Sequence, residues 1–390
     1  MSGVRPWLSR LVRRQYFWGI VAILLLLVLN LIKDPTYLAI RTNPATGNLA
    51  GNLLDILRAA APILMISVGM ALVIATGGID LSVGSLMAVA GAVSMEFLNP
   101  ITDSSSVGAM LAAVGLALLL TGVLGAVNGV LVTVVGLQPF ISTLVMMLAG
   151  RGVAKVITSG QNTTAVNEPF RWIANGYLFR FPVVFFIAVA VVVLVALAVR
   201  RTALGLMIES IGINRQASRM AGIKPRGIII SVYVMSGVLA GIAGIFSVSS
   251  VMTVDVSRTG YQLELDAILA VVIGGTSLAG GKFSFGGTVV GSLLIATLDK
   301  TVVFLGVSAA ATPAFKAGVI IVLCLLQSDV RALIRRHLSG LTRRPFRPEP
   351  VGIAEREMAA EPAVAAGHQA EDGAKHHREA GAERQREVTV

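Results

Sequence analysis

The feature that most constrains this chain is a succession of apolar runs, each long enough to cross a lipid bilayer as a helix. A helical span needs about 20 mostly apolar residues, and the sequence holds about ten such runs, of which Leu53–Ala75 is typical. Backbone amides inside a bilayer must bond within their own segment, so these runs are expected to be helical. We therefore predict an all-α, polytopic integral membrane protein with about ten transmembrane helices.

Polar or glycine-rich segments separate the predicted helices and set their limits. The first run ends at Asn30 through Pro35 without a small-residue cleavage site, so we expect an uncleaved span rather than a signal peptide. The predicted spans are residues 16–32, 53–75, 79–98, 107–135, 138–157, 181–199, 228–250, 263–278, 285–305 and 313–326. The chain thus divides into a cytoplasmic segment 1–14, a membrane domain 15–330 with a basic loop at about 200–227, and a tail 339–390.

The distribution of basic residues predicts the orientation in the membrane. Of the 32 Lys and Arg residues, four precede the first apolar run, six lie in the loop 200–227 and eleven follow the last run. Cytoplasmic loops carry an excess of Lys and Arg, and ten spans put these three segments on one side. Both termini are therefore expected in the cytoplasm. The tail 339–390 is expected to be disordered, because it has almost no large apolar residues to bury.

Composition and motifs exclude several other classes of protein. The single cysteine, Cys324, excludes a disulfide-stabilised secreted fold. The basic residues follow the ends of the spans, whereas a nucleic-acid-binding protein would cluster them on one soluble face. The sequence has no Gly-x-x-x-x-Gly-Lys-[Ser/Thr] phosphate loop, no nucleophile elbow and only four histidines, so we expect no enzyme activity, metal or cofactor.

Asp80 carries the strongest functional signal among the polar residues, because a carboxylate between two apolar runs is costly in lipid. It follows Gly77-Gly78, which allow the backbone to leave the helix, and it precedes Ser82. Asp80 and Ser82 are candidates to bond a polar solute. The competing interpretation is local: either side chain begins the next helix and bonds its first amides.

Four further polar residues are candidates for the substrate pathway. Glu264 and Asp266 open the run 263–278, where they either favour the positive end of a helix or line an external mouth. Asn128 and Gln138 are uncharged amides at membrane depth. Such amides either bind the hydroxyls of a solute or hold helices together by hydrogen bonds.

The basic loop 200–227 contains a local helix signal. Asn214 is expected to cap a short helix over residues 215–220, with Gly222 ending it and Pro225 preventing its continuation. A short helix outside the membrane is suited to docking against a soluble partner. The alternative is a surface helix that rests on lipid headgroups.

Four blocks of the sequence together cover roughly residues 53–330. They are Thr76–Ser85, Ala203–Ile223, Leu263–Gly275 with Gly280-Gly281, and Gln138–Leu144 with Gly150–Val153. These blocks resemble sugar-importing ABC permeases of the ribose/galactofuranose group, with galactofuranose permeases as the nearest likeness. The blocks are specific to the family and much less so to the sugar, and the tail after Ser339 lies outside the resemblance.

The resemblance implies a permease subunit that moves a monosaccharide across the bacterial inner membrane. Two such subunits, identical or paired with a sister chain, would enclose a pathway fed by a periplasmic sugar-binding protein. A separate chain with ATP-binding cassettes would dock on the loop and drive transport. The residues expected to carry this coupling are Glu209, Gly212, Asn214, Ala217 and Gly222.

Three other functions compete with this interpretation. A branched-chain amino-acid permease of the wider superfamily is disfavoured by Asp80 and by the sugar-permease-like sequence of residues 76–85. A proton- or sodium-coupled carrier needs titratable residues in mid-span, for which Asp80, Glu264 and Asp266 are the candidates. A membrane-embedded enzyme needs a nucleophile or a metal set, and the sequence shows neither.

Overall fold

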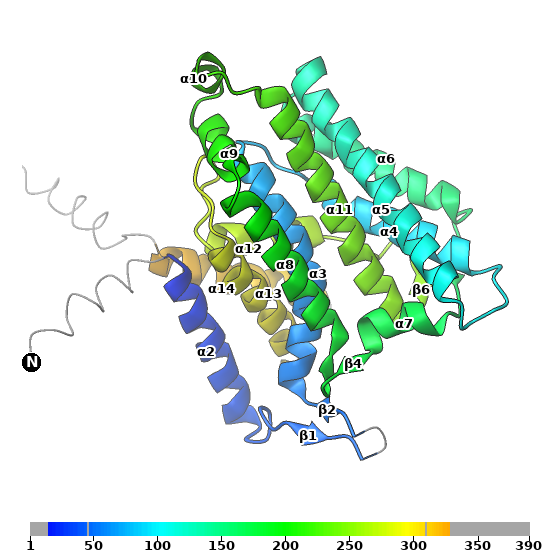
Figure 1. Cartoon of the computed structure of the whole chain (residues 1–390). Coiled ribbons are helices and arrows are strands. Elements are labelled where there is room, and N and C mark those ends of the chain that lie inside the picture. Colours follow the sequence, from blue (N-terminus) through cyan, green and yellow to red (C-terminus); the bar gives the residue numbers. More distant parts are fainter. Residues whose placement is uncertain (1–14, 45–46, 309, 328–390) are drawn as a thin grey trace, which may run out of the picture. The chain divides into compact units, whose positions relative to one another are not determined.

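The computed structural model describes residues 15–44, 47–308 and 310–327, and most of these residues are helical (Figure 1). The predictions for the segment 1–14 and for the tail 339–390 lie outside the described residues.

The helices follow one another with short connections. In chain order they are α2 (Gln15–Lys33), α3 (Asn52–Ala75), α4 (Val83–Leu98), α5 (Val107–Val130), the π-helix η1 (Leu131–Val135), α6 (Pro139–Ile157), α7 (Glu168–Asn175), α8 (Val183–Arg200), α9 (Ala203–Ile213), α10 (Arg215–Met220), α11 (Pro225–Val251), α12 (Leu263–Ile273), α13 (Phe285–Leu305) and α14 (Thr312–Gln327).

The strands are two residues long and form three antiparallel pairs. They are β1 (Arg41–Thr42) with β2 (Leu49–Ala50), β3 (Thr163–Thr164) with β6 (Thr253–Val254), and β4 (Tyr177–Leu178) with β5 (Phe181–Pro182). The pair β3–β6 joins two loops that lie far apart in the sequence, whereas the other two pairs close local hairpins.

Each of the ten predicted spans contains a helix. Within the described residues, six helices are long and apolar enough to cross a membrane, namely α3, α5 continued by η1, α6, α8, α11 and α13. The helices α2, α4 and α14 are apolar but shorter. The prediction for residues 263–278 was wrong in length: α12 ends at Ile273, because Gly275 turns the chain with a φ of 91°.

Two further differences come from residues that the span prediction treated as loop. The segment between α6 and α8, which was left outside the predicted spans, contains α7, which Asn167 caps by accepting a hydrogen bond from the Phe170 amide. Helix α10 ends before Pro225, as expected, but Pro225 also occupies the first position of α11, which therefore begins before the predicted start at residue 228. A proline at that position lacks only an amide that would have no partner within the helix.

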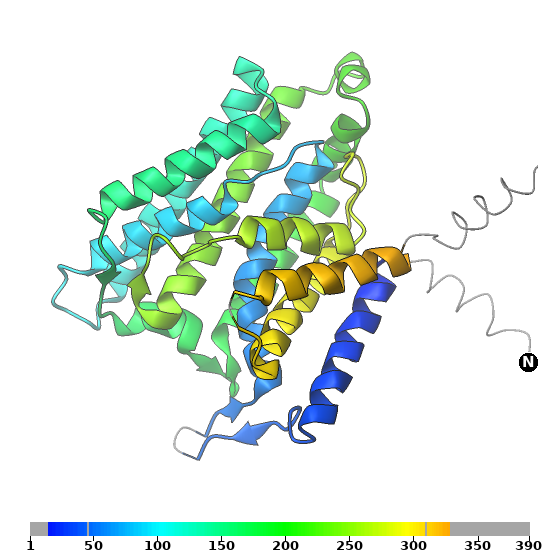
Figure 2. The same ribbon diagram turned by 180° about the vertical axis from the view of Figure 1, so that it is seen from behind.

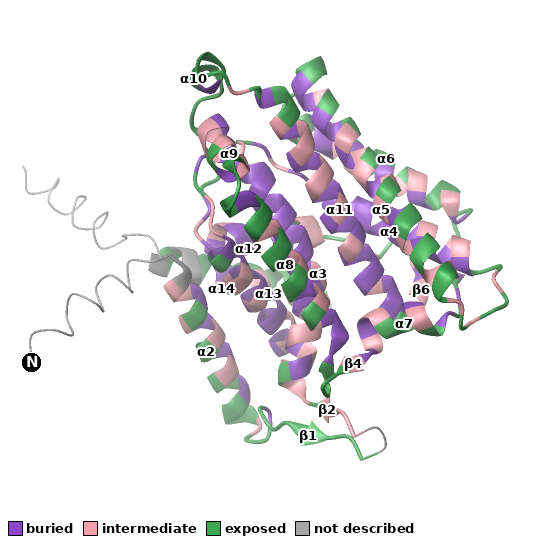
Figure 3. Cartoon of the chain, viewed as in Figure 1, coloured by how far each residue is buried: buried purple, intermediate pink, exposed green. Residues whose placement is uncertain are grey.

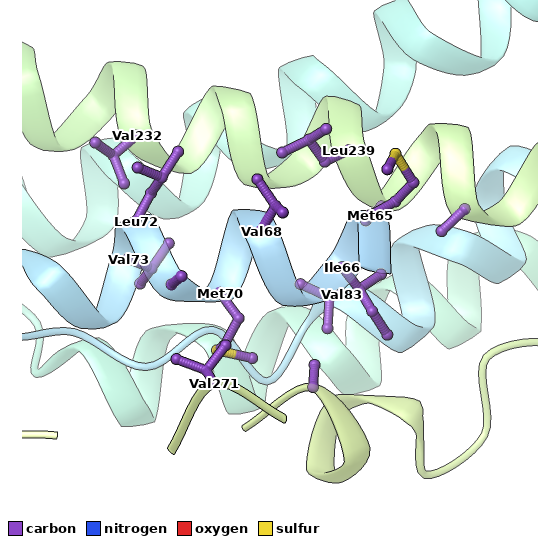
Figure 4. Packing of buried hydrophobic residues seen from close by; sticks show 14 of the residues in the cluster. Met65, Ile66, Val68, Met70, Leu72, Val73, Val83, Val232, Leu239 and Val271 are labelled. Atoms are coloured by element: carbon purple, nitrogen blue, oxygen red, sulfur yellow. The ribbon is translucent and has the colours of Figure 1, made fainter. Parts of the chain in front are cut away.

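The core is organised around α3. A helix that is apolar all round is expected to be buried, and residues Met65 through Ala75 of α3 are completely buried. Figure 4 shows Leu72, Val68 and Met65 packed against Val232 and Leu239 of α11. In Figure 3 α3 is mostly buried, while α5 and α8 carry many exposed residues. Their exposed side chains include Leu111, Leu119 and Leu194.

Helices α5 and α11 approach each other closely, which small residues permit. A Cβ atom at Gly125 would collide with the carbonyl oxygen of Tyr233, and one at Gly237 would collide with that of Thr121. The two helices can therefore pack tightly because glycines replace larger residues at their contact. This contact fixes α11 against the part of α5 that carries Asn128.

The loops that were predicted to alternate across the membrane lie at opposite ends of the bundle. Figure 1 shows α9 and α10 at one end and α7, β1, β2 and β4 at the other. Seen from behind in Figure 2, α14 lies beside α2 and α13. The six basic residues of the loop 200–227 thus gather at the end away from α7.

Candidate functional site

The site begins at the break between α3 and α4. Helix α3 ends in a glycine turn, in which the Gly77 amide donates to the carbonyl of Ile74 at 2.9 Å and the Gly78 amide to that of Val73 at 3.1 Å. Gly77 has a φ of 80°, which only glycine adopts without strain. Gly78 lies against the Tyr233 hydroxyl, a buried group that has no hydrogen-bond partner among the described residues. The chain then turns back into the core and carries Asp80 with it.

Asp80 accepts hydrogen bonds within a buried network. Its Oδ1 accepts from the hydroxyl of Ser82 at 2.5 Å and from the amide of Ser82 at 3.0 Å, and its Oδ2 accepts from the hydroxyl of Ser236 at 2.7 Å. The Asp80 side chain is 1% exposed, and no salt bridge reaches it within the described part of the chain. A buried carboxylate held only by neutral donors is expensive, so each of these bonds matters to the fold.

The network continues through Asn128. The Asn128 amide group donates to the Ser82 hydroxyl at 2.9 Å, and the Ser142 hydroxyl donates to Asn128 Oδ1 at 3.4 Å. The network therefore joins α5, α6 and α11 to the α3–α4 break. Of the predicted pathway residues, the structure brings together Asp80, Ser82 and Asn128.

Asp80 was expected either to begin the next helix or to bond a polar solute, and the geometry is compatible with both interpretations. It bonds the Ser82 amide just before α4, as a residue that begins a helix does, and it also bonds a distant helix through Ser236. The sequence did not single out Ser236 or Ser142, because a serine in an apolar helix usually bonds its own backbone.

The local turn that Asp80 forms with Ser82 occurs again outside the membrane. There Asp103 accepts from the amide and hydroxyl of Ser105, and these bonds lower the pKa of Asp103.

Gln138 lies apart from the network. It precedes α6 at its exposed N-terminal end, and its side chain makes no capping hydrogen bond. Its contribution to the helix comes from its carbonyl, which accepts from the Ser142 amide at 3.0 Å.

Glu264 and Asp266, expected to act together, point to different partners. Asp266 accepts a charged hydrogen bond from Lys316 of α14 at 2.9 Å, and the same ammonium lies 2.6 Å from Asp299 of α13. Glu264 instead lies against Gly84 of α4, and its buried Oε2 has no hydrogen-bond partner within the part of the chain that the structure describes. Both residues lie in the first turn of α12, where carboxylates are favourable.

Arg151 is a further charged residue near this end of α12. Its Nη1 donates to the carbonyls of Val256 at 2.7 Å and Thr259 at 2.6 Å, so α6 holds the loop that leads into α12. Asp299, Lys316 and Arg151 were not predicted as site residues. The only signal that could have found them is that each is a charge within an apolar run.

Removing the Lys316 ammonium tests whether this ion cluster stabilises the bundle. In Lys316→Met the carboxylates of Asp266 and Asp299 lose their shared cation, and we expect a loss of about 3 kcal/mol in the free energy of unfolding. Thermal unfolding in detergent measures the effect. The double variant Lys316→Met with Asp299→Asn removes one of the two repelling charges and should recover part of the loss. Equal stability of the single variant and the wild type would contradict a structural role.

The basic loop folds as predicted over residues 215–220. The Oδ1 of Asn214 accepts from the amides of Gln216 and Ala217, both at 2.9 Å, and Gly222 leaves the helix with a φ of 84°. Helix α9, which precedes it, was not predicted. Asn214, Ala217 and Gly222 are exposed, whereas Glu209 and Gly212 are half-buried on α9. Desolvation, with a contribution from Arg219, lowers the pKa of Arg215.

Gly212 connects this loop to the α3–α4 break. A Cβ atom at Gly212 would overlap the carbonyl oxygen of Ala75, the last residue of α3, and the amide of Gly281. The Gly281 amide donates to the same Ala75 carbonyl at 3.0 Å. Helix α9 therefore rests directly on the end of α3, five residues before Asp80.

The described residues contain no group of three or more His, Cys, Asp or Glu side chains that could hold a metal ion.

Comparisons with known proteins give a consistent picture. Residues 52–325 match the family described as the permease component of branched-chain amino acid transport systems. A fructose import permease of Bifidobacterium longum is 54% identical over 324 residues, which cover 82% of this chain and 89% of that protein. The galactofuranose transporter permease of Escherichia coli K12 is 41% identical over 81% and 92%, and the ribose import permease of the same strain is 38% identical over 81% and 97%. No solved structure matches the chain.

Proposed function

We propose, from the premise that this chain belongs to the permease-component family of branched-chain amino acid transport systems, that it imports a monosaccharide as the membrane subunit of an ATP-driven transporter. The observation that carries the proposal is its identity of 38–54% to import permeases for fructose, galactofuranose and ribose along most of each chain. These relatives favour a sugar over an amino acid as the substrate. The chain is a multi-pass inner-membrane protein, as its family and its apolar helices indicate.

The loop 200–227 is the part that we propose docks on an ATPase chain. Its helices α9 and α10 expose three large apolar side chains, Leu206 at 72%, Ile213 at 73% and Met220 at 86%. Exposed apolar side chains on a basic loop outside the membrane suit a soluble partner with an apolar groove. Glu209, Gly212, Asn214, Ala217 and Gly222 belong to the same two helices or to the turn after them and are proposed to transmit its movement.

The transport step would then use the contact between Gly212 and α3. Closure of the ATPase chains would push α9, and α9 would shift the α3–α4 break with Asp80 and Ser82. Asn128 follows through its bond to Ser82. We assign these three residues to the substrate-linked part of the permease, and Gln138, Glu264 and Asp266 to the ends of the helices around it.

The remaining partners and the orientation follow from the same proposal. Ten spans with both termini in the cytoplasm would put the loop 200–227 on the ATPase side and α7 on the outer side. A periplasmic sugar-binding protein would deliver the solute to the outer end. A second permease subunit, the same chain or a sister, would complete the pathway.

Affinity purification from the native host in a mild detergent tests the proposal. We expect a chain with two ATP-binding cassettes to co-purify, and Met220→Glu to reduce its recovery several-fold. Phe179→Glu is the matched control, because Phe179 is 83% exposed but lies at the opposite end of the bundle. A stable chain that purifies without an ATPase and transports sugar in a proton gradient would refute the proposal.

A further inference from the structure

A polar pocket lies at the α7 end of the bundle, outside the site described above. It has a volume of about 560 Å³, and its lining includes Glu168, Arg171, Trp172 and Asn175 of α7, together with Ser105. Glu168 and Arg171 are both exposed, and their side chains have no hydrogen-bond or ion-pair partner in the part of the chain that the structure describes. The pocket thus offers one unpaired carboxylate and one unpaired guanidinium a single helical turn apart.

An apolar groove of about 450 Å³ lies beside this pocket, between α5, α7, α8 and α11. Its lining consists of apolar and aromatic side chains from Val107 to Leu118 on α5, with Ile187 and Val191 on α8 and Ile242 to Phe246 on α11. Eleven residues of helix rise about 16 Å. This length is close to half of the roughly 30 Å hydrocarbon core, so the groove is long enough to accommodate an acyl chain of one leaflet.

Pro169 and Trp172 line both the pocket and the groove, so the two form one continuous surface. Trp172 is 52% exposed, at the place where the lining changes from polar to apolar. Tryptophan is enriched at this depth of a membrane, because its ring is apolar and its N–H is polar. The surface therefore has a charged end at the headgroup level and an apolar end within one leaflet.

We propose that this surface binds one glycerophospholipid that has an amine-bearing zwitterionic headgroup. The phosphate lies at Arg171, the ammonium at Glu168, and one acyl chain fills the groove down to Leu118. Charge complementarity selects this occupant: the pair Arg171 and Glu168 sums to zero and matches a headgroup with one charge of each sign. The inference rests on the membrane location of the chain and not on the identity of its transported solute.

Native mass spectrometry of the detergent-purified permease, titrated with phosphatidylethanolamine, tests the proposal. We expect Arg171→Gln and Glu168→Gln each to weaken lipid retention about fivefold, as for loss of one partly exposed ion pair. Arg180→Gln is the matched control, because Arg180 is equally exposed at the same end but lies outside the pocket. Val114→Trp fills the groove and should weaken retention without changing any charge.

The comparison ligands separate the possible sources of binding. Phosphatidylglycerol keeps the phosphate and chains but lacks the amine, and free phosphoethanolamine keeps the headgroup but lacks the chains; both should bind more weakly than phosphatidylethanolamine. Equal retention of phosphatidylglycerol, or equal effects of Arg171→Gln and Arg180→Gln, would overturn the assignment. If the permease forms a dimer that buries Trp172 and retains no lipid, the groove binds a second copy of the chain and the proposal is wrong.

Discussion

Gly212→Ala is expected to lower ATP-driven sugar uptake about tenfold while ATP hydrolysis by the assembled transporter continues, a change of ~1.4 kcal/mol in coupling. In an ordinary helix this substitution is favourable by up to about 1 kcal/mol. At Gly212 the new methyl group would overlap the Ala75 carbonyl and the Gly281 amide, which are backbone atoms that cannot rotate away. Helix α9 would have to move off the end of α3 and would lose its direct contact with the α3–α4 break.

Gly227→Ala is the matched control for this experiment. Gly227 lies in the first turn of α11, next to the same loop, and a Cβ atom there meets nothing within 4 Å. It should transport normally and be as stable as the wild type. Uptake and ATP hydrolysis are measured together in proteoliposomes that contain the complete transporter. Normal uptake by Gly212→Ala would contradict a coupling role for the contact between α9 and α3.

Asp80 gives the second large effect, and two substitutions separate its roles. Asp80→Ala leaves the buried hydroxyls of Ser82 and Ser236 without their acceptor and should destabilise the protein by about 3 kcal/mol. Asp80→Asn keeps an oxygen for Ser82 and places an amide group opposite the Ser236 hydroxyl, which can accept from it. The asparagine variant should therefore assemble normally.

We expect Asp80→Asn to reduce uptake at least about tenfold despite normal assembly, if the carboxylate charge serves transport as proposed for intramembrane carboxylates in general. Asp103→Asn is the control, because Asp103 makes the same turn with Ser105 in an exposed loop. Unfolding in detergent and sugar uptake in proteoliposomes give the two readouts. If Asp80→Asn transports like the wild type, the residue only begins α4 and joins helices.

Local signals in the sequence were sufficient to place a helix in each of the ten predicted spans and to identify one cap. The apolar runs are helical because a bilayer leaves the backbone no other way to satisfy its amides. Asn214 caps α10 because its side chain reaches amides two and three residues ahead, a contact that needs no tertiary structure. The length of α12 was misjudged because the predicted span was extended to Leu278, past the glycines at which the helix ends.

The partners of the polar residues depended on the tertiary structure alone. A polar face tells which side of a helix turns outward, but α5 and α8 are apolar all round, since both lipid and protein neighbours are apolar. The sequence was therefore sufficient to identify Asp80, Ser82 and Asn128 as candidates. It did not show that Ser236 and Ser142 complete their hydrogen-bond network. In the same way, the sequence grouped Glu264 with Asp266. In the structure Glu264 lies against Gly84, whereas Asp266 pairs with Lys316. The sequence by itself determined the number and chemistry of the apolar segments, and close packing between helices decided which of their few polar groups meet.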